Sequence, residues 1–344
     1  MRHHTMKNIM TVIVLSILIF VVTPSKAAID LNVAPDMSMI KPISKLDLPR
    51  GFTFVIDKPL FNQTEAANVP FTTNQATLEN ANQSFLSEYD MVWHMMSNDY
   101  ENFYLIGQAN DRHVGGYETR TDKSAFGIRI GDSRATVQKQ YGEPIQHITK
   151  DKKNYVQNYE DKAGNITSGT YKIDDYYVTF FYDIHQSDHV RSITWILADI
   201  ENTKPGFFRT TISTDFRNAT EEMMVHLINQ TRVAQGLHAL TYTPTYNPIA
   251  RKHSADMITN NYFDHVNPSG HNARNRLHDG GLTFSYYGEN LAYGQYSPIY
   301  AHEALMNSEG HRKNILYADF THIIVGVDFD SKGVPYFTIN FYRK

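Results

Sequence analysis

The spacing of apolar residues changes near Ser213, and this change most restricts the fold. From about Phe85 to Ile200, short runs of aromatic and β-branched residues alternate with Gly, Asn and Asp, which is typical of strands and hairpins. After Ser213, apolar residues recur at helical spacing. A chain of 344 residues has room for two ordinary domains. We therefore expect an α+β protein with a β-rich domain over 85–205 and a more helical domain over 213–344.

Two segments of the first domain resemble each other. They read NFYLIGQANDRHVGGYET from Asn102 and YYVTFFYDIHQSDHVRSITW from Tyr176, and each has an apolar run, a polar turn, His-Val and a second apolar run. This similarity predicts two hairpins and an internal duplication. Between them, Ser133 is suited to begin a helix and Gly142 to end it.

Three helices and a hairpin are predicted in the second domain. The helical segments run from Thr220, taken as an N-cap, to Gln235, from Asn247 to Asn260, and from Ser297 to Asn307. The chain from His322 onward alternates and turns sharply near Gly333, which predicts a hairpin.

The N-terminal segment has the pattern of a secretory signal. Its apolar run, Ile9 to Val22, is shorter than the roughly 20 residues that span a bilayer, and Ser25 and Ala27 suit a cleavage site. We expect a signal peptide over 1–27, with an uncleaved anchor as the alternative, and a polar lead-in over 28–84. After cleavage we expect no membrane-spanning segment and a protein that is secreted or held at the cell surface.

Charge and cysteine content exclude several classes of function. The net charge is −4, and removal of the three basic residues of the signal would make it −7, so the chain is not suited to neutralising nucleic-acid phosphates. The sequence has no cysteine, which excludes disulfides, thiolate catalysis and Cys-ligated zinc. A secreted chain without cysteine fits a Gram-positive bacterial exterior. Any metal must therefore be held by nitrogen and oxygen ligands.

Histidine-containing motifs concentrate in the second domain, where nine of the 16 histidines lie between His226 and His322. Four motifs follow in order: INQTRVAQGLHAL from Ile228, HSADMITNNYFDHVNPSG from His253, GENLAYG from Gly288 and NSEGHRKNIL from Asn307. Together they resemble the CAP superfamily of cysteine-rich secretory, antigen-five and pathogenesis-related proteins, in its cysteine-free bacterial branch. Farther upstream, GIRIGDSRATVQKQYGEP from Gly127 resembles the CAP-associated domain that precedes bacterial CAP domains.

The resemblance implies an α-β-α sandwich with a small antiparallel sheet between helical layers. It also implies a cavity with two histidines and two acidic residues, and the matching positions are His265, His311 and Glu289. The fourth position, usually a Glu, falls on Ser308, with Glu303 and Glu309 as alternatives.

Residues of these types permit three kinds of role. Two neutral imidazoles and a carboxylate can hold Zn²⁺ or another divalent ion, can act as general acid and base, or can only tie loops together. The zinc-protease pattern HExxH is not completed, since Met306 stands where its second histidine is needed after His302.

Three hypotheses of function follow. The first is a binding or effector protein with an unidentified extracellular ligand, from the cell wall or a host, and it assigns no reaction. The second is a metal-dependent, peptidase-like hydrolase in which Glu289 activates a zinc-bound water. The third is a structural surface module.

Overall fold

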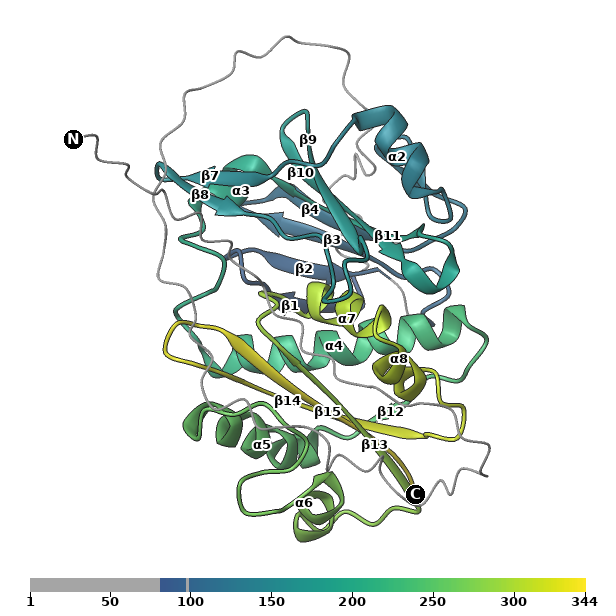
Figure 1. The fold of residues 1–344 in the computed structure, drawn as a ribbon, viewed down its shortest axis with the longest axis vertical. Helices are drawn as coiled ribbons and strands as arrows, with labels where there is room; N and C mark the ends of the chain where they lie inside the picture. The colour runs from purple at the N-terminus through teal and green to yellow at the C-terminus, as the bar shows by residue number, and fades with distance from the viewer. Residues whose placement is uncertain (1–80, 97–98) are drawn as a thin grey trace, which may run out of the picture.

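The computed structural model describes residues 81–96 and 99–344. The predicted signal peptide over 1–27 and most of the predicted lead-in over 28–84 lie outside these residues. The described elements stack in layers, with the sheet of the first domain above a helical layer, a second sheet and a further helical layer (Figure 1). Within the described ranges, no helix combines the length and apolar character needed to cross a membrane.

The first domain is built on a seven-stranded sheet in which all neighbours run antiparallel. In spatial order its strands are β1 (Gln83–Leu86), β2 (Val92–Met95), β3 (Tyr104–Ala109), β4 (Arg112–Glu118), β11 (His189–Leu197), β10 (Tyr176–Asp183) and β9 (Ser168–Ile173). Both predicted hairpins are present as β3–β4 and β10–β11, and they lie side by side because β4 pairs with β11. The internal duplication stays a prediction.

Short elements complete this domain. The predicted helix is present as α2, and the Ser133 side chain caps its first turn. The elements are β5 (Ser124–Ala125), β6 (Ile128–Arg129), α2 (Arg134–Tyr141), β7 (His147–Lys150), β8 (Lys153–Val156), the 3₁₀ turn η1 (Ile184–Gln186) and α3 (Ala198–Thr203).

The second domain has a four-stranded sheet of mixed direction. Its strands are, in spatial order, β12 (Thr241–Tyr242), β14 (His322–Phe329), β15 (Pro335–Arg343) and β13 (Tyr286–Tyr293). The three long strands are antiparallel, as expected, and β14–β15 is the predicted C-terminal hairpin. The sheet is mixed only because β12 joins β14 in parallel through two residues.

Helices cover both faces of this sheet, which confirms the α-β-α sandwich (Figure 1). One layer holds α4, α7 and α8, and the opposite layer holds α5 and α6. Their bounds are α4 (Thr214–Ala234), α5 (Asn247–Thr259), α6 (Ala273–Asp279), α7 (Pro298–Met306) and α8 (Glu309–Ile315), with the 3₁₀ turn η2 (Pro244–Tyr246) before α5.

The first helix of this domain begins earlier than its sequence pattern predicts. Its N-cap is Ser213, whose hydroxyl accepts a hydrogen bond from Phe216 N, whereas Thr220 lies inside the helix. The Thr220 hydroxyl is buried and donates to the Phe216 carbonyl. A threonine can bond to the helix backbone in this way without ending the helix, so its residue type alone did not locate the start.

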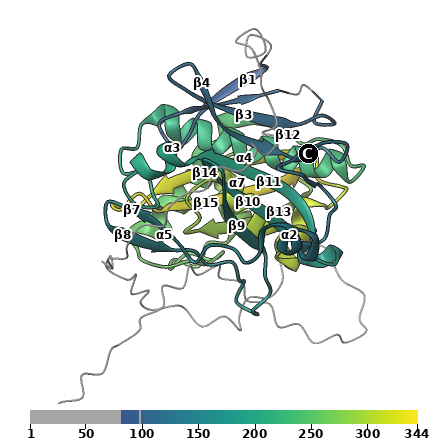
Figure 2. The same ribbon diagram turned by 90° about the horizontal axis from the view of Figure 1, so that it is seen from above.

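Helix α4 belongs to two cores at once. Met224, Val225 and Ile228 pack in the core over the second sheet. Met223 and Leu227 pack with Phe85, Trp93 and other residues of the first domain. Figure 1 shows α4 and α7 between the two sheets, and the sheets overlap in the view from above (Figure 2). The two domains therefore share a continuous apolar interface.

Candidate functional site

Three residues distant in sequence lie on neighbouring elements of the second domain. His265 lies in the loop between α5 and α6, Glu289 on β13 and His311 on α8. His265 Nδ1 is 2.9 Å from Glu289 Oε1. Helix α8, which carries His311, is joined to β13 beside Glu289, because Asn290 Nδ2 donates to the His311 carbonyl at 3.0 Å. We call His265, Glu289 and His311 the histidine site.

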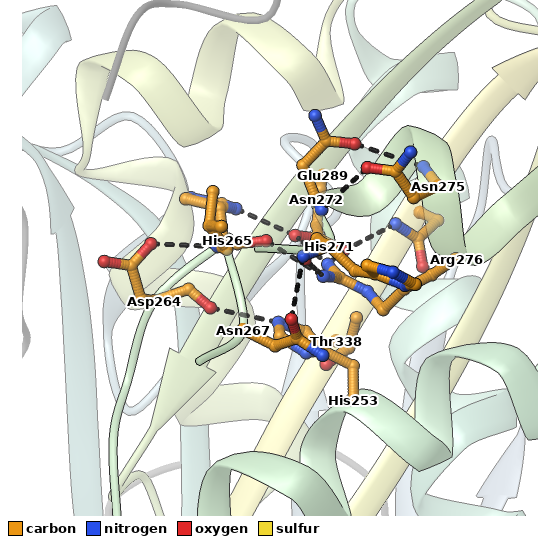
Figure 3. A network of polar contacts seen from close by, with 12 residues as sticks. His253, Asp264, His265, Asn267, His271, Asn272, Asn275, Arg276, Glu289 and Thr338 are labelled. Carbon is orange, nitrogen blue, oxygen red and sulfur yellow. Dashed lines mark hydrogen bonds and ion pairs between the residues drawn. The ribbon is translucent and has the colours of Figure 1, made fainter. Parts of the chain in front are cut away.

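Arg276 holds the carboxylate of the histidine site, a role that the sequence motifs did not indicate. From α6, its Nη2 donates to both oxygens of Glu289, at 2.9 and 2.8 Å. Its Nη1 donates to the carbonyls of His265 and His271, at 3.0 and 2.8 Å. Figure 3 shows these side chains converging beside α6. Arg276 therefore fixes the carboxylate and the loop that carries His265 together.

Both oxygens of Glu289 are occupied. Asn340 on β15 donates to Oε2 at 2.8 Å, in addition to the bonds from Arg276 and His265. Burial alone would raise the pKa of Glu289, but the Arg276 charge and the His265 hydrogen bond hold this pKa well below its usual range. Glu289 is therefore an anion at any physiological pH.

The bond to Glu289 determines which His265 nitrogen faces outward as an acceptor. An ionised carboxylate can only accept, so Nδ1 of His265 carries the shared hydrogen. In the neutral ring, Nε2 then keeps its lone pair. The His265 side chain is 25% exposed, so this ring is accessible to a ligand.

His311 is buried, and its Nδ1 has no hydrogen-bond partner within the described chain. Burial, together with the nearby charge of His265, lowers the pKa of His311 to about 3. The ring is therefore neutral at pH 7. Its backbone is held by Asn290, whose Nδ2 donates to the His311 carbonyl at 3.0 Å.

Ser308 lies one helical turn before His311, at the N-cap of α8. Its side chain makes no capping bond, and its Oγ is buried with no partner in the described ranges. Buried polar atoms nearly always have a partner, in the protein or in ordered solvent. Two such atoms, on Ser308 and His311, therefore mark this turn as a place where a ligand or water can bind.

Family models match both parts of the chain. The model described as the cysteine-rich secretory protein family matches residues 225–341, and the model described as CAP-associated N-terminal matches residues 72–207. The chain therefore carries a CAP domain preceded by a CAP-associated domain. Its lack of cysteine is consistent with the cysteine-free bacterial branch.

Two bacterial proteins are similar in sequence to parts of this chain. The "Uncharacterized membrane protein YlbC" of Bacillus subtilis is 29% identical over 272 residues, covering 75% of this CAP protein and 77% of that one. The "Uncharacterized protein YkwD" of the same species is 43% identical over 117 residues, covering 34% of this chain. The match spans less than half, 46%, of YkwD.

Two solved structures have a similar fold. An extracellular protein with an SCP domain from Bacillus anthracis has a TM-score of 0.66 at 21% identity, covering 84% of this CAP protein and all of that chain. A cysteine-rich secretory protein from Staphylococcus aureus has a TM-score of 0.62 at 16% identity, covering 78% and 90%. At these identities the likeness concerns the fold alone.

The two acidic alternatives for the fourth position are engaged elsewhere. Glu303 on α7 is buried against the first domain, where it accepts hydrogen bonds from Tyr117, Ser192 and Arg191. Glu309 is exposed and pairs with Lys313 at 2.6 Å. The structure therefore leaves Ser308 as the residue of the three that lies beside His311 with a free polar atom.

A complete metal-ligand set is not formed by side chains of the described residues, where no group of three or more His, Asp or Glu is arranged to hold an ion. His253, a further histidine near the site, has a structural role. Its Nε2 is bonded to the Asp264 carbonyl at 3.0 Å, and burial lowers its pKa to about 4. Two imidazoles of the histidine site therefore remain as candidate ligands, the partly exposed ring of His265 and the buried ring of His311.

A hollow between the two domains is separate from the histidine site. It is lined by aromatic and polar side chains that include Trp93, Tyr89 and Tyr296. The Lys204 ammonium lies over the Tyr89 and Tyr296 rings, 4.2 and 4.3 Å from their centroids. Because the Lys204 side chain already covers the faces of these rings, we assign the hollow to the domain interface.

Proposed function

We propose that this CAP protein is an extracellular binding or effector protein, secreted or held at the cell surface, whose histidine site binds a ligand. The observation that carries the proposal is the pair of buried polar atoms on Ser308 and His311 that have no partner among the described residues, together with the His265 ring that Glu289 orients. The apolar run from Ile9 to Val22 and the extracellular relative of similar fold support the location. The partner is an unidentified extracellular molecule, of the cell wall or of a host.

A divalent cation such as Zn²⁺ is the simplest ligand that fits these groups. Neutral imidazoles at His265 and His311 are suitable ligands, and solvent would complete an open site. Glu289 would act behind His265, because a carboxylate bonded to the distal ring nitrogen orients a ligating histidine and raises its basicity. With two protein ligands, we expect binding much weaker than at a structural zinc site.

The hydrolase alternative is better supported with His265, and not Glu289, as the base. Glu289 is poorly suited to take a proton from water, because its pKa is held low and both oxygens are occupied. Nε2 of His265, oriented by that carboxylate, has the arrangement of a general base. If the site hydrolyses a substrate, His265 is the base and Glu289 orients it.

Calorimetric titration of Zn²⁺ into the chelator-stripped chain tests the proposal. The His265→Ala/His311→Ala variant should lose stoichiometric uptake. The matched control is His271→Ala/His278→Ala, which removes two exposed imidazoles and should bind like the wild type. Equal weak binding by all three proteins would contradict a metal site. A peptide and cell-wall hydrolysis assay on the same proteins separates the binding protein from the hydrolase, and a site variant altered only in stability would favour the structural module.

A further inference from the structure

The turn between α7 and α8 is anchored by the other domain. Asn307, at the end of α7, donates from Nδ2 to the Tyr182 carbonyl at 2.8 Å and accepts at Oδ1 from Ile184 N at 3.2 Å. The Asn307 carbonyl lies 3.1 Å from Nε2 of His185. Three contacts therefore connect this one residue to residues 182–185, the turn formed by the end of β10 and the start of η1.

A buried ion pair forms a second anchor on the same turn. Arg312 Nη1 donates to the Asp183 carboxylate at 2.9 and 3.1 Å, and the two side chains are only 14% and 5% exposed. Asp183 is itself fixed, because it accepts a hydrogen bond from His185 N at the start of η1. Arg312 directly follows His311 on α8.

Ser308 and His311 lie between these two anchors. Helix α8 has seven residues and no side-chain cap, so its own hydrogen bonds define its position poorly. Within its own domain, its His311 carbonyl is held by Asn290. Farther along the helix, Asn314 donates to the Glu289 carbonyl and Arg232 donates to the Ile315 carbonyl. At the start of the helix, residues 182–185 hold Asn307 and Arg312, which come immediately before Ser308 and immediately after His311.

We infer that the turn of residues 182–185 positions the histidine site, with Asp183 acting through Arg312 and the turn backbone acting through Asn307. The CAP-associated domain thereby sets where Ser308 and His311 stand relative to His265. The consequence for binding rests on the proposed function of the site, whereas the positioning itself does not. Asp183 is a positioning residue, since it touches Arg312 and not a ligand.

A second polar network at the same interface provides a matched control. Glu303 is buried and accepts hydrogen bonds from Tyr117, Ser192 and Arg191, but none of these contacts reaches the α7–α8 turn. Asp183→Asn and Glu303→Gln each convert one buried interface carboxylate into an amide of the same shape. A role that only holds the domains together would make the two variants equivalent.

The experiment compares both variants with the wild type in the full chain, using Zn²⁺ calorimetry and the visible absorption of bound Co²⁺. Asp183→Asn should weaken Zn²⁺ binding at least fivefold and alter the Co²⁺ bands, while Glu303→Gln stays within twofold with unchanged bands. Equal binding by Asp183→Asn and wild type, or equal weakening by both variants, would overturn the inference.

If the wild type binds no metal, the proposed metal site is wrong, but the positioning role can still be tested by a measurement without metal. The ring resonances of His311 and the amide exchange of residues 307–315 are then compared by NMR. Asp183→Asn should shift the His311 resonances and speed exchange at least tenfold, with Glu303→Gln leaving both unchanged. Wild-type shifts and exchange in Asp183→Asn would refute the positioning role, and a wild-type-like dispersed spectrum elsewhere confirms that the variant is folded.

Discussion

Arg276 and Glu289 form a two-point contact in which one guanidinium nitrogen reaches both oxygens of the carboxylate, at 2.9 and 2.8 Å. The carboxylate is buried, so its negative charge depends on this partner. Because the same arginine also bonds the His265 carbonyl, the pair connects the charge of the histidine site to its loop geometry.

Removal of this arginine should be strongly destabilising. Arg276→Met leaves a buried carboxylate without its counter-charge, and we expect a loss of about 3–5 kcal/mol in the free energy of unfolding. Arg274→Met, an exposed change on the same helix, should stay within about 0.5 kcal/mol. Urea denaturation measures both, and a loss below about 1 kcal/mol for Arg276→Met would refute the dependence.

Stability should fall between pH 6 and pH 5. Burial lowers the pKa of His226 and His253 to about 4, and of His311 to about 3, so these rings bind protons in the unfolded chain before they do so in the folded one. Their contribution to the free energy of unfolding is complete above pH 6.5, the pKa of a histidine in the unfolded chain, and is lost as the pH falls below it. Glu88 acts oppositely, because burial raises its pKa to about 7 and its contribution disappears as the pH rises through that value.

Between pH 6 and pH 5, these pKa shifts give a net uptake of roughly two protons on unfolding. The free energy of unfolding should therefore fall by about 2 kcal/mol over this interval. Urea denaturation at the two pH values measures the loss. In His311→Gln the loss should shrink by about 1 kcal/mol. Stability that is constant or rises toward pH 5 would contradict the assignment of neutral, buried rings.

Ser308→Ala should separate stability from binding. The Ser308 hydroxyl is buried without a partner among the described residues, so its removal should leave stability unchanged or raise it by up to about 1 kcal/mol, while weakening Zn²⁺ binding. Ser254→Ala is the contrast, because the Ser254 hydroxyl bonds the Gly326 carbonyl and Thr338, and its loss should cost about 1–3 kcal/mol. Thermal unfolding of the two variants is the measurement. Equal destabilisation would show that Ser308 has a structural partner.

Gly326 allows α5 to lie directly on β14. A Cβ at this position would stand 2.0 Å from Arg251 N and 2.3 Å from Ala250 C, both backbone atoms that cannot move aside independently. We expect Gly326→Ala to cost about 3 kcal/mol. Gly281→Ser is the comparison. Gly281 is exposed and has nothing near its Cβ position, so only its positive φ of 78° opposes the change. Near-wild-type stability of Gly326→Ala in urea would contradict the close packing.

The sequence predicted those features that depend on local residue type. Capped helices such as α2 and α7 and the C-terminal hairpin follow from Ser-, Pro- and Gly-based signals within a few residues. His265, Glu289 and His311 were identified because each lies in a short motif of the resembled family, and the structure joins His265 to Glu289 by a hydrogen bond.

Features that depend on distant partners were not predictable in this way. Arg276 occurs in an ordinary polar helix, and only the folded contact with Glu289 gives it a role. Glu303 was an alternative for the fourth acidic position, yet its partners Tyr117, Ser192 and Arg191 come from the other domain. Spacing along one chain segment does not indicate which surface of α7 faces a second domain.

The central claim is that Glu289 holds Nδ1 of the His265 ring, which leaves Nε2 as the nitrogen for a ligand, and that a buried, neutral His311 belongs to the same site. NMR of ¹⁵N-labelled histidine rings, recorded at pH 7 before and after addition of Zn²⁺, tests it most directly. We expect His265 as the Nδ1–H tautomer and Zn²⁺-dependent shifts of its Nε2 and of the His311 ring, with His271 and His278 unmoved. A His265 ring protonated at Nε2, or shifts confined to the exposed histidines, would contradict the account.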